Sequence, residues 1–179
     1  MSHHHHHHHH LEVLFQGPSM GVLNYEDELI SPVPPARLFK SLVLDGDNLI
    51  PKLLPHAFKS FQILEGHGGP GTIKLVTFAD GSPYKTAKHR IDEIDEENYI
   101  YKYSVIGGDA LGEDFDSMTH GFKIEVGADG GSICKTTSTF HTKGEDHVIQ
   151  EKIKAGKERA KAIFKAVETH LHAHPHEYN

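Results

Sequence analysis

Apolar residues recur every three or four positions near the C-terminal end of the chain, from about Asp146 to His172. This spacing matches the turn of an α-helix and places the apolar residues on one face. The stretch contains no proline and one glycine, and most of its lysines and glutamates fall on the other faces. The pattern predicts one long helix whose apolar stripe consists of Ile149, Ile153, Ala160, Ile163, Phe164, Val167 and Leu171.

A strand and two short helices are expected at the other end of the chain. Val22–Ile30 has the composition of a strand, and the proline-rich residues 31–35 end it and suit the first turn of a helix. Asp47 is the expected N-cap of the second helix, which Pro55 ends. The apolar positions of the two helices are Leu38, Phe39, Leu42 and Val43, then Leu49, Ile50, Leu53 and Leu54.

The central part of the chain alternates apolar runs with glycine, proline, asparagine and aspartate turns at fairly even spacing. This pattern is typical of antiparallel strands joined in sequence. A helix as long as the C-terminal one needs a large apolar surface to cover, and the sheet is the only candidate. We therefore predict an α+β fold in which a strongly curved, seven-stranded antiparallel sheet wraps around the long helix. The six central strands are Phe58–Leu64, Thr72–Phe78, Tyr84–Ile94, Tyr99–Ile106, Phe115–Val126 and Ser132–His141.

Composition narrows the class of protein. His3–His10 is typical of an affinity tag and residues 11–18 of a protease site, so we expect residues 20–179 to form a single domain. The formal charge of −7 becomes −6 without Glu12 of that leader, which argues against DNA or an anionic membrane as the main partner. Cys134 is the only cysteine, so no intrachain disulfide is possible, and a cytoplasmic protein without signal peptide or cofactor is expected.

A glycine-rich loop lies between the first two central strands and contains Gly66, His67, Gly68, Gly69 and Gly71. Such loops can bind phosphate, but a phosphate-binding loop leads into Gly-Lys-Ser/Thr and a helix. Here Thr72 opens a strand instead. The loop is therefore interpreted as a rigid hairpin at the rim of the domain.

Alternation along the strands predicts which side chains point inward. The inward sets combine aromatic and apolar residues with histidine, threonine and serine, a mixture that favours a pocket for a small molecule over a uniform core. These sets are Ala87, His89 and Ile91; Tyr101, Tyr103 and Val105; Met118, His120, Phe122 and Ile124; and Cys134, Thr136, Ser138 and Phe140.

Several segments together resemble the plant pathogenesis-related class 10 proteins, the Bet v 1-like family that includes the major birch-pollen allergen. The segments are GV at 21–22, PPARLFK at 34–40, DNLIPK at 47–52, ILEG at 63–66, GGPGTIK at 68–74, KHRID at 88–92, GGSI at 130–133, HTKG at 141–144, KAGKE at 154–158 and EYN at 177–179. The resemblance implies a helix-grip fold with a large internal cavity. It also implies a monomeric, defence-related carrier of small amphipathic ligands such as cytokinins, flavonoids or steroid-like molecules, with no membrane insertion and no specific nucleic acid.

Alternation and the resemblance together nominate a set of ligand-binding residues, with Lys74 at the cavity mouth by resemblance. His67 and Thr86 depart from the family pattern and are expected to change that mouth. The nominated residues are Ile50, Phe58, Lys74, Val76, Phe78, Tyr84, His89, Ile91, Tyr101, Tyr103, Phe115, Met118, His120, Phe122, Cys134, Thr136, Ile153, Ala160 and Phe164.

Two enzymatic alternatives stay open beside the carrier. The resemblance implies a weak ribonuclease that would use Lys74, Asp116 and Glu168, with His170 in place of the usual tyrosine. A charge on an amphipathic helix, however, usually belongs to its solvated face, which is the expectation for Glu168. A synthase or isomerase using the same cavity is the other alternative, although the residue set of the alkaloid-forming relatives has no match here.

The chain ends with His170, His172, His174 and His176. His172 and His176 would be one helical turn apart, but Pro175 indicates that the helix has ended by then. No cysteine or acid is expected to complete a closed site. We therefore expect no metal.

Overall fold

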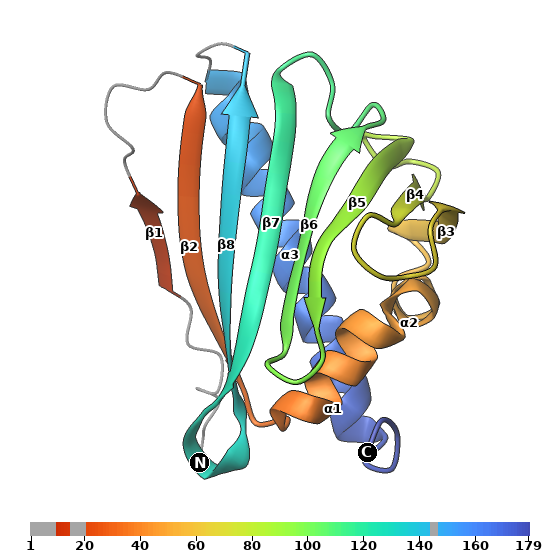
Figure 1. Ribbon diagram of the computed structural model, residues 1–179, viewed down its shortest axis with the longest axis vertical. Helices are drawn as coiled ribbons and strands as arrows, with labels where there is room; N and C mark the ends of the chain where they lie inside the picture. The colour runs from red at the N-terminus through yellow and green to blue at the C-terminus, as the bar shows by residue number, and fades with distance from the viewer. Residues whose placement is uncertain (1–9, 15–20, 144–146) are drawn as a thin grey trace.

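The structure is a computed structural model that describes residues 10–14, 21–143 and 147–179. A single curved sheet faces one long helix, and two short helices lie at one end of both (Figure 1). The elements are β1 (His10–Leu14), β2 (Val22–Ser31), α1 (Pro35–Phe39), η2 (Lys40–Leu44), α2 (Gly46–Leu53), β3 (Phe58–Glu65), β4 (Ile73–Phe78), β5 (Thr86–Asp95), β6 (Ile100–Gly107), β7 (Phe115–Val126), η3 (Ala128–Gly130), β8 (Ser132–Thr142) and α3 (His147–Ala173).

The predicted seven strands, long helix and two short helices are confirmed. The strands follow the order β1-β2-β8-β7-β6-β5-β4-β3, and every neighbouring pair is antiparallel. Strand β1 is an eighth strand that the sequence pattern did not predict. It lies within the segment expected to be a tag and protease-site leader, and it pairs with β2 along its outer edge, with His10 opposite Glu28 and Leu14 opposite Asn24.

The first short helix differs from the expected regular helix over Leu38–Val43. It is α-helical to Phe39 and then continues as the π-helical turn η2, in which the Asp45 N–H donates to the Lys40 carbonyl at 2.9 Å. The Ser41 hydroxyl donates to the carbonyls of Arg37 and Leu38, both at 3.0 Å, and such bonds compete with regular helical pairing.

The second short helix begins two residues earlier than predicted. Its N-cap is Asp45, which makes no side-chain capping bond, so the assignment of Asp47 as the cap is wrong. Asp47 lies in the first turn, where the helix dipole favours a carboxylate. Its carboxylate is directed to β4, as described below.

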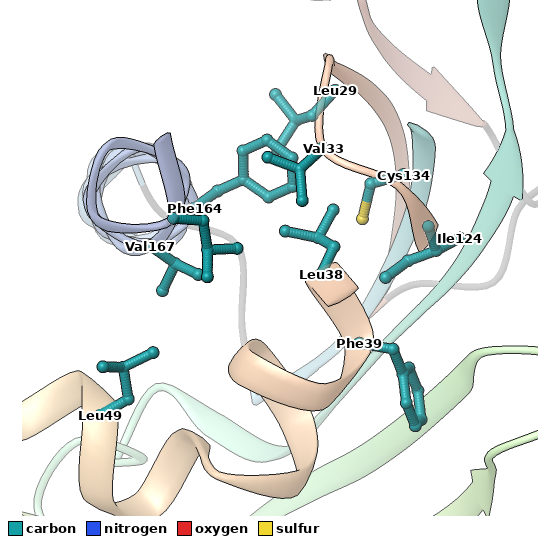
Figure 2. Close-up of a cluster of buried hydrophobic side chains, with 10 residues drawn as sticks. Leu29, Val33, Leu38, Phe39, Leu49, Ile124, Cys134, Phe164 and Val167 are labelled. Atoms are coloured by element: carbon teal, nitrogen blue, oxygen red, sulfur yellow. The ribbon is translucent and has the colours of Figure 1, made fainter. Parts of the chain in front are cut away.

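The core is densest where α1 and α2 meet the sheet and the C-terminal half of α3, a cluster called here the packed end (Figure 2). Leu38 and Leu171 are completely buried in it. The packed end consists of Leu29, Val33, Leu38, Phe39, Leu49, Ile124, Cys134, Phe164, Val167 and Leu171. A second cluster at the other end of the sheet contains Tyr25, Phe115, Phe140, Ile149 and Ile153.

Helix α3 is buried near both ends but not in the middle. Ile149 and Ile153 pack into the second cluster, and Phe164, Val167 and Leu171 pack into the packed end. No residue from 154 to 163 is fully buried. The middle of the helix therefore crosses the sheet without filling the space between them.

No helix in the described part of the chain is long and apolar enough to cross a membrane.

Candidate functional site

A cavity of about 320 Å³ lies between the concave face of the sheet and the middle of α3. Its volume falls within the range of small-molecule sites, at the lower end of about 300–1,000 Å³. Seventeen of the nominated residues line it: Ile50, Phe58, Lys74, Val76, Phe78, Tyr84, His89, Tyr101, Tyr103, Phe115, Met118, His120, Phe122, Cys134, Thr136, Ala160 and Phe164. Contact of these residues with a ligand stays a prediction.

Two nominated residues do not line the cavity. Ile153 is buried in the second cluster against Phe115 and Phe140, beyond the hollow part of α3. Ile91 is buried as well, and its main chain pairs with Gly71 and Thr72 at the base of the glycine-rich loop. Their inward direction was predicted correctly, but they serve packing.

A row of polar side chains crosses the cavity wall from strand to strand. Tyr103 lies opposite His120 in the β6–β7 register, and His120 lies opposite Ser138 in the β7–β8 register. The His120 Nδ1 and the Ser138 Oγ are 2.8 Å apart, within hydrogen-bonding distance. His89 extends the row on β5, because its ring stacks on Tyr103 with centroids 4.6 Å apart and an interplanar angle of 24°.

Burial keeps the polar groups of this row uncharged near neutral pH. Desolvation lowers the pKa of His89 to about 3, with His120 and Lys74 adding to the effect. Desolvation and the nearby Lys157 lower the pKa of His120 to about 4. Desolvation also raises the pKa of Tyr103 to about 12 and that of Tyr101 well above its usual range. The row therefore offers neutral hydrogen-bond donors and acceptors on an aromatic wall.

Part of this hydrogen-bonding capacity is not used within the protein. In the described part of the chain, no group hydrogen-bonds to the Tyr103 hydroxyl or to the ring of His89. Both face the cavity. Buried polar groups normally have partners, so water or a ligand is expected there.

Lys74, which the resemblance nominates, lines the cavity. It is 8% exposed, and its Nζ lies 2.9 Å from both carboxylate oxygens of Asp47 on α2. The ion pair joins α2 to β4 across one end of the cavity.

The sequence pattern missed the contribution of α3 cations to the cavity. Three lysines assigned to the outer faces of the helix line it instead, together with an arginine that the pattern did not place: Lys152, Lys157, Lys161 and Arg159. The Arg159 Cζ lies 5.9 Å from the ring centroids of both Phe78 and Tyr84, in cation–π geometry. A helix that spans a hollow shows its flanks to that hollow, and sequence spacing alone does not reveal where the hollow lies.

Asp27 is a second missed residue, and its signal was present in the sequence. It lines the cavity, is 8% exposed and alternates with the inward-facing Tyr25 and Leu29 on β2. Burial, with a small contribution from Asp27, raises the pKa of the nearby Cys134 thiol to about 12, so the thiol stays protonated.

The structure does not bring the ribonuclease residues together in the cavity. Lys74 lines the cavity and is paired with Asp47, whereas Asp116 is exposed on β7. Glu168 is 6% exposed and does not line the cavity, so its assignment to a solvated face is wrong. The packed end covers α3 more broadly there, since Val167 and Glu168 are both buried.

The glycine-rich loop closes on Thr72 rather than on the cavity. The Gly68 N–H donates to the Thr72 Oγ1 at 2.9 Å, and a Cβ on Gly66 would lie 2.7 Å from the same oxygen. Gly66, His67, Gly68, Gly69 and Gly71 are all outside the cavity lining. His67 is exposed, and Thr86 uses its main-chain N–H to bind Asp109 at 2.8 Å. Neither residue belongs to the lining, and their expected effect on its mouth stays a prediction.

The C-terminal histidines pair differently from the sequence expectation. His170 and His174 face each other, rather than His172 and His176, with ring centroids 4.2 Å apart. An acid lies beside them, because the Glu177 Oε1 accepts a hydrogen bond from the His170 Nε2 at 2.8 Å. The sequence pattern did not predict the nearness of this acid, and the expectation that no acid completes a closed site stays a prediction.

Comparison with known proteins gives a consistent relationship. The model of the pathogenesis-related protein Bet v 1 family matches residues 20–174. The major allergen Pru av 1 of Prunus avium is 53% identical over 160 residues, which is 89% of this chain and 100% of that protein. The major strawberry allergen Fra a 1-2 of Fragaria ananassa is 51% identical over 159 residues, covering 89% of this chain and 99% of that protein.

Solved structures agree. The crystal structure of Ara h 8.0201 has a TM-score of 0.78 and 45% identity, covering 86% of this chain and 99% of that one. A norcoclaurine synthase from Thalictrum flavum, in complex with dopamine and hydroxybenzaldehyde, has a TM-score of 0.65 at 20% identity over 91% of this chain and 97% of that one, a likeness of fold alone. The chain belongs to the pathogenesis-related protein Bet v 1 family.

Proposed function

We propose that the protein is a carrier that binds small amphipathic plant metabolites or hormones, such as a cytokinin, a flavonoid or a steroid-like molecule, in the cavity under α3. The observation that carries this proposal is the neutral polar row of His89, Tyr103, His120 and Ser138 set among the aromatic and apolar side chains of the wall. A few polar groups that converge in an apolar pocket favour a ligand with an apolar body and polar substituents.

The charged groups of the cavity refine the ligand class. Lys74 is already paired with Asp47, and Arg159 lies against two aromatic rings. A flat aromatic ligand could therefore stack on the tyrosine and histidine rings while its hydroxyl, carbonyl or ring nitrogen groups bond to Tyr103 and His89. A cytoplasmic location and a role in defence are part of the same proposal, and both follow from the family and not from the cavity.

Displacement of the fluorescent probe ANS by a cytokinin or a flavonoid tests this function. Tyr103→Phe keeps the ring but removes the hydroxyl. It should therefore lower the affinity for the displacing ligand by about two- to ten-fold, which corresponds to the loss of one neutral hydrogen bond. Tyr99→Phe is the matched control, because Tyr99 packs against the packed end and does not line the cavity. Failure of every cytokinin and flavonoid to displace the probe would refute the carrier function.

A further inference from the structure

The last turn of α3 and the residues after it bring two imidazoles and a carboxylate together at the end of the molecule, beyond Phe164, the last residue of the helix that lines the cavity. His170, His174 and Glu177 each offer one ligand atom, and the three atoms lie within 4.8 Å of one another. The His170 Nε2 donates to the Glu177 Oε1 at 2.8 Å, so a metal that binds this nitrogen takes the place of the proton, which is released to solvent. Tetrahedral zinc with ligands at 2.0–2.1 Å needs its ligand atoms about 3.3 Å apart, so small side-chain rotations would close the group around one ion.

A hydrogen bond to the main chain fixes the exposed His174 in a tautomer that can bind a metal. The His174 Nδ1 lies 2.9 Å from the His170 carbonyl oxygen, which can only accept, so Nδ1 carries the proton. The Nε2 of neutral His174 then keeps its lone pair for a metal. Histidine ligands in proteins commonly donate their other ring N–H to a main-chain carbonyl in this way.

The backbone around the group is held from outside. Arg37 on α1 donates to the carbonyls of Leu171 at 2.8 Å, of His174 at 2.6 Å and of Glu177 at 2.8 Å. These three bonds fold the C-terminal segment back over the end of α3 and return Glu177 to the side of His170. The geometry is therefore fixed by the fold before any ion arrives, which lowers the ordering cost of binding.

We propose that His170, His174 and Glu177 form a surface site for Zn²⁺ or a similar imidazole-preferring divalent ion. Two histidines four residues apart at the end of a helix, with one carboxylate, supply three ligands, and water completes an open tetrahedral site. The ion would fasten the C-terminal segment to α3. The charge of Arg37 nearby lowers the affinity relative to a closed four-ligand site, and magnesium, which prefers six oxygen ligands, should not bind.

Zinc binding is measured on protein freed of the His3–His10 tag, by competition with a chromophoric chelator and by calorimetry. His170→Gln and Glu177→Gln should each lower the affinity for Zn²⁺ by at least about ten-fold, since even the loss of a residue that only supports a metal ligand lowers metal affinity about 10–100-fold. The double variant His172→Gln/His176→Gln is the matched control, because both histidines are exposed and outside the group, and it should bind as the wild type does.

A thermal shift provides a second readout. Zn²⁺ should raise the Tm of the wild type and of the control, but not that of His170→Gln, because an ion that binds only the folded protein stabilises it. Mg²⁺ at the same concentration should leave all Tm values unchanged. The site is refuted if the tag-free wild type does not compete with the chelator, or if His170→Gln and Glu177→Gln bind Zn²⁺ as tightly as the control does.

Discussion

The packed end and the cavity are built from the same sheet and the same helix, yet they differ in what fills the space between them. At the packed end, α1 and α2 supply side chains such as Leu38, Phe39 and Leu49 that close the gap (Figure 2). In the middle of α3 no residue from 154 to 163 is fully buried, and polar rings face the hollow. The packed end therefore provides the stability that allows the cavity to stay open.

The largest effect should come from a matched pair of leucines on the first helical segment. Leu38→Ala removes a completely buried side chain of the packed end and should cost about 3–5 kcal/mol of unfolding free energy. Leu42 is only partly buried and borders the cavity, so Leu42→Ala enlarges an existing hollow and should cost about 1–2 kcal/mol. Urea denaturation measures both. Equal losses would show that the two regions do not divide stability in this way.

A smaller effect should reveal the cost of the polar row, and only in acid. The pKa values of His89 and His120 are about 3 and 4 in the folded protein and near their ordinary value of 6.5 when unfolded. Between these values the unfolded chain binds protons that the folded protein excludes, so stability is complete above about pH 6.5 and falls as the pH falls toward 4.

Each ring should contribute up to about 1.4 kcal/mol between pH 6.5 and 5.5. Urea titrations at several pH values measure the slope, and His89→Gln/His120→Gln should flatten it relative to the wild type. Subtraction of the two curves removes the contribution of carboxylates, which both proteins share. An unchanged slope would mean that water already solvates both rings.

A matched pair of glycines tests whether the glycine-rich loop supports the fold or the cavity. A Cβ on Gly66 would lie 2.7 Å from the Thr72 Oγ1, and Gly66 has a φ of +91°, so Gly66→Ala should cost about 1–3 kcal/mol. Gly69 has open space around it and no positive φ, so Gly69→Ala should stay within about 0.5 kcal/mol. Thermal unfolding compares them. A loss of ANS binding in Gly66→Ala without a loss of stability would place the loop with the cavity instead.

The element order and the inward faces of the strands could be predicted because they depend on periodicity, which the sequence contains directly. Thus Tyr101 and Tyr103, Cys134 and Thr136, and the apolar stripe of α3 lie where alternation and helical spacing put them. The strand pattern could also have found Asp27. What could not be predicted were features that depend on how two elements meet.

The hollow under α3, which turns Arg159 into a lining residue, exists only because the helix is supported at its two ends. The burial of Glu168 similarly depends on the helices that cover α3 at the packed end. The meeting of His170 with Glu177 depends on Arg37, which is more than a hundred residues away in the chain. Each is set by tertiary contacts that no local pattern encodes.

Strand β1 has a practical consequence for the choice of protein in solution studies. The segment His10–Leu14, which the sequence predicts to belong to an added leader, pairs in register along β2, from His10 opposite Glu28 to Leu14 opposite Asn24. The outer edge of β2 is thus able to template a foreign strand, as open sheet edges commonly are. In protein that carries His10–Leu14 this edge of β2 is covered. Self-association is therefore best measured by light scattering on samples with the leader removed.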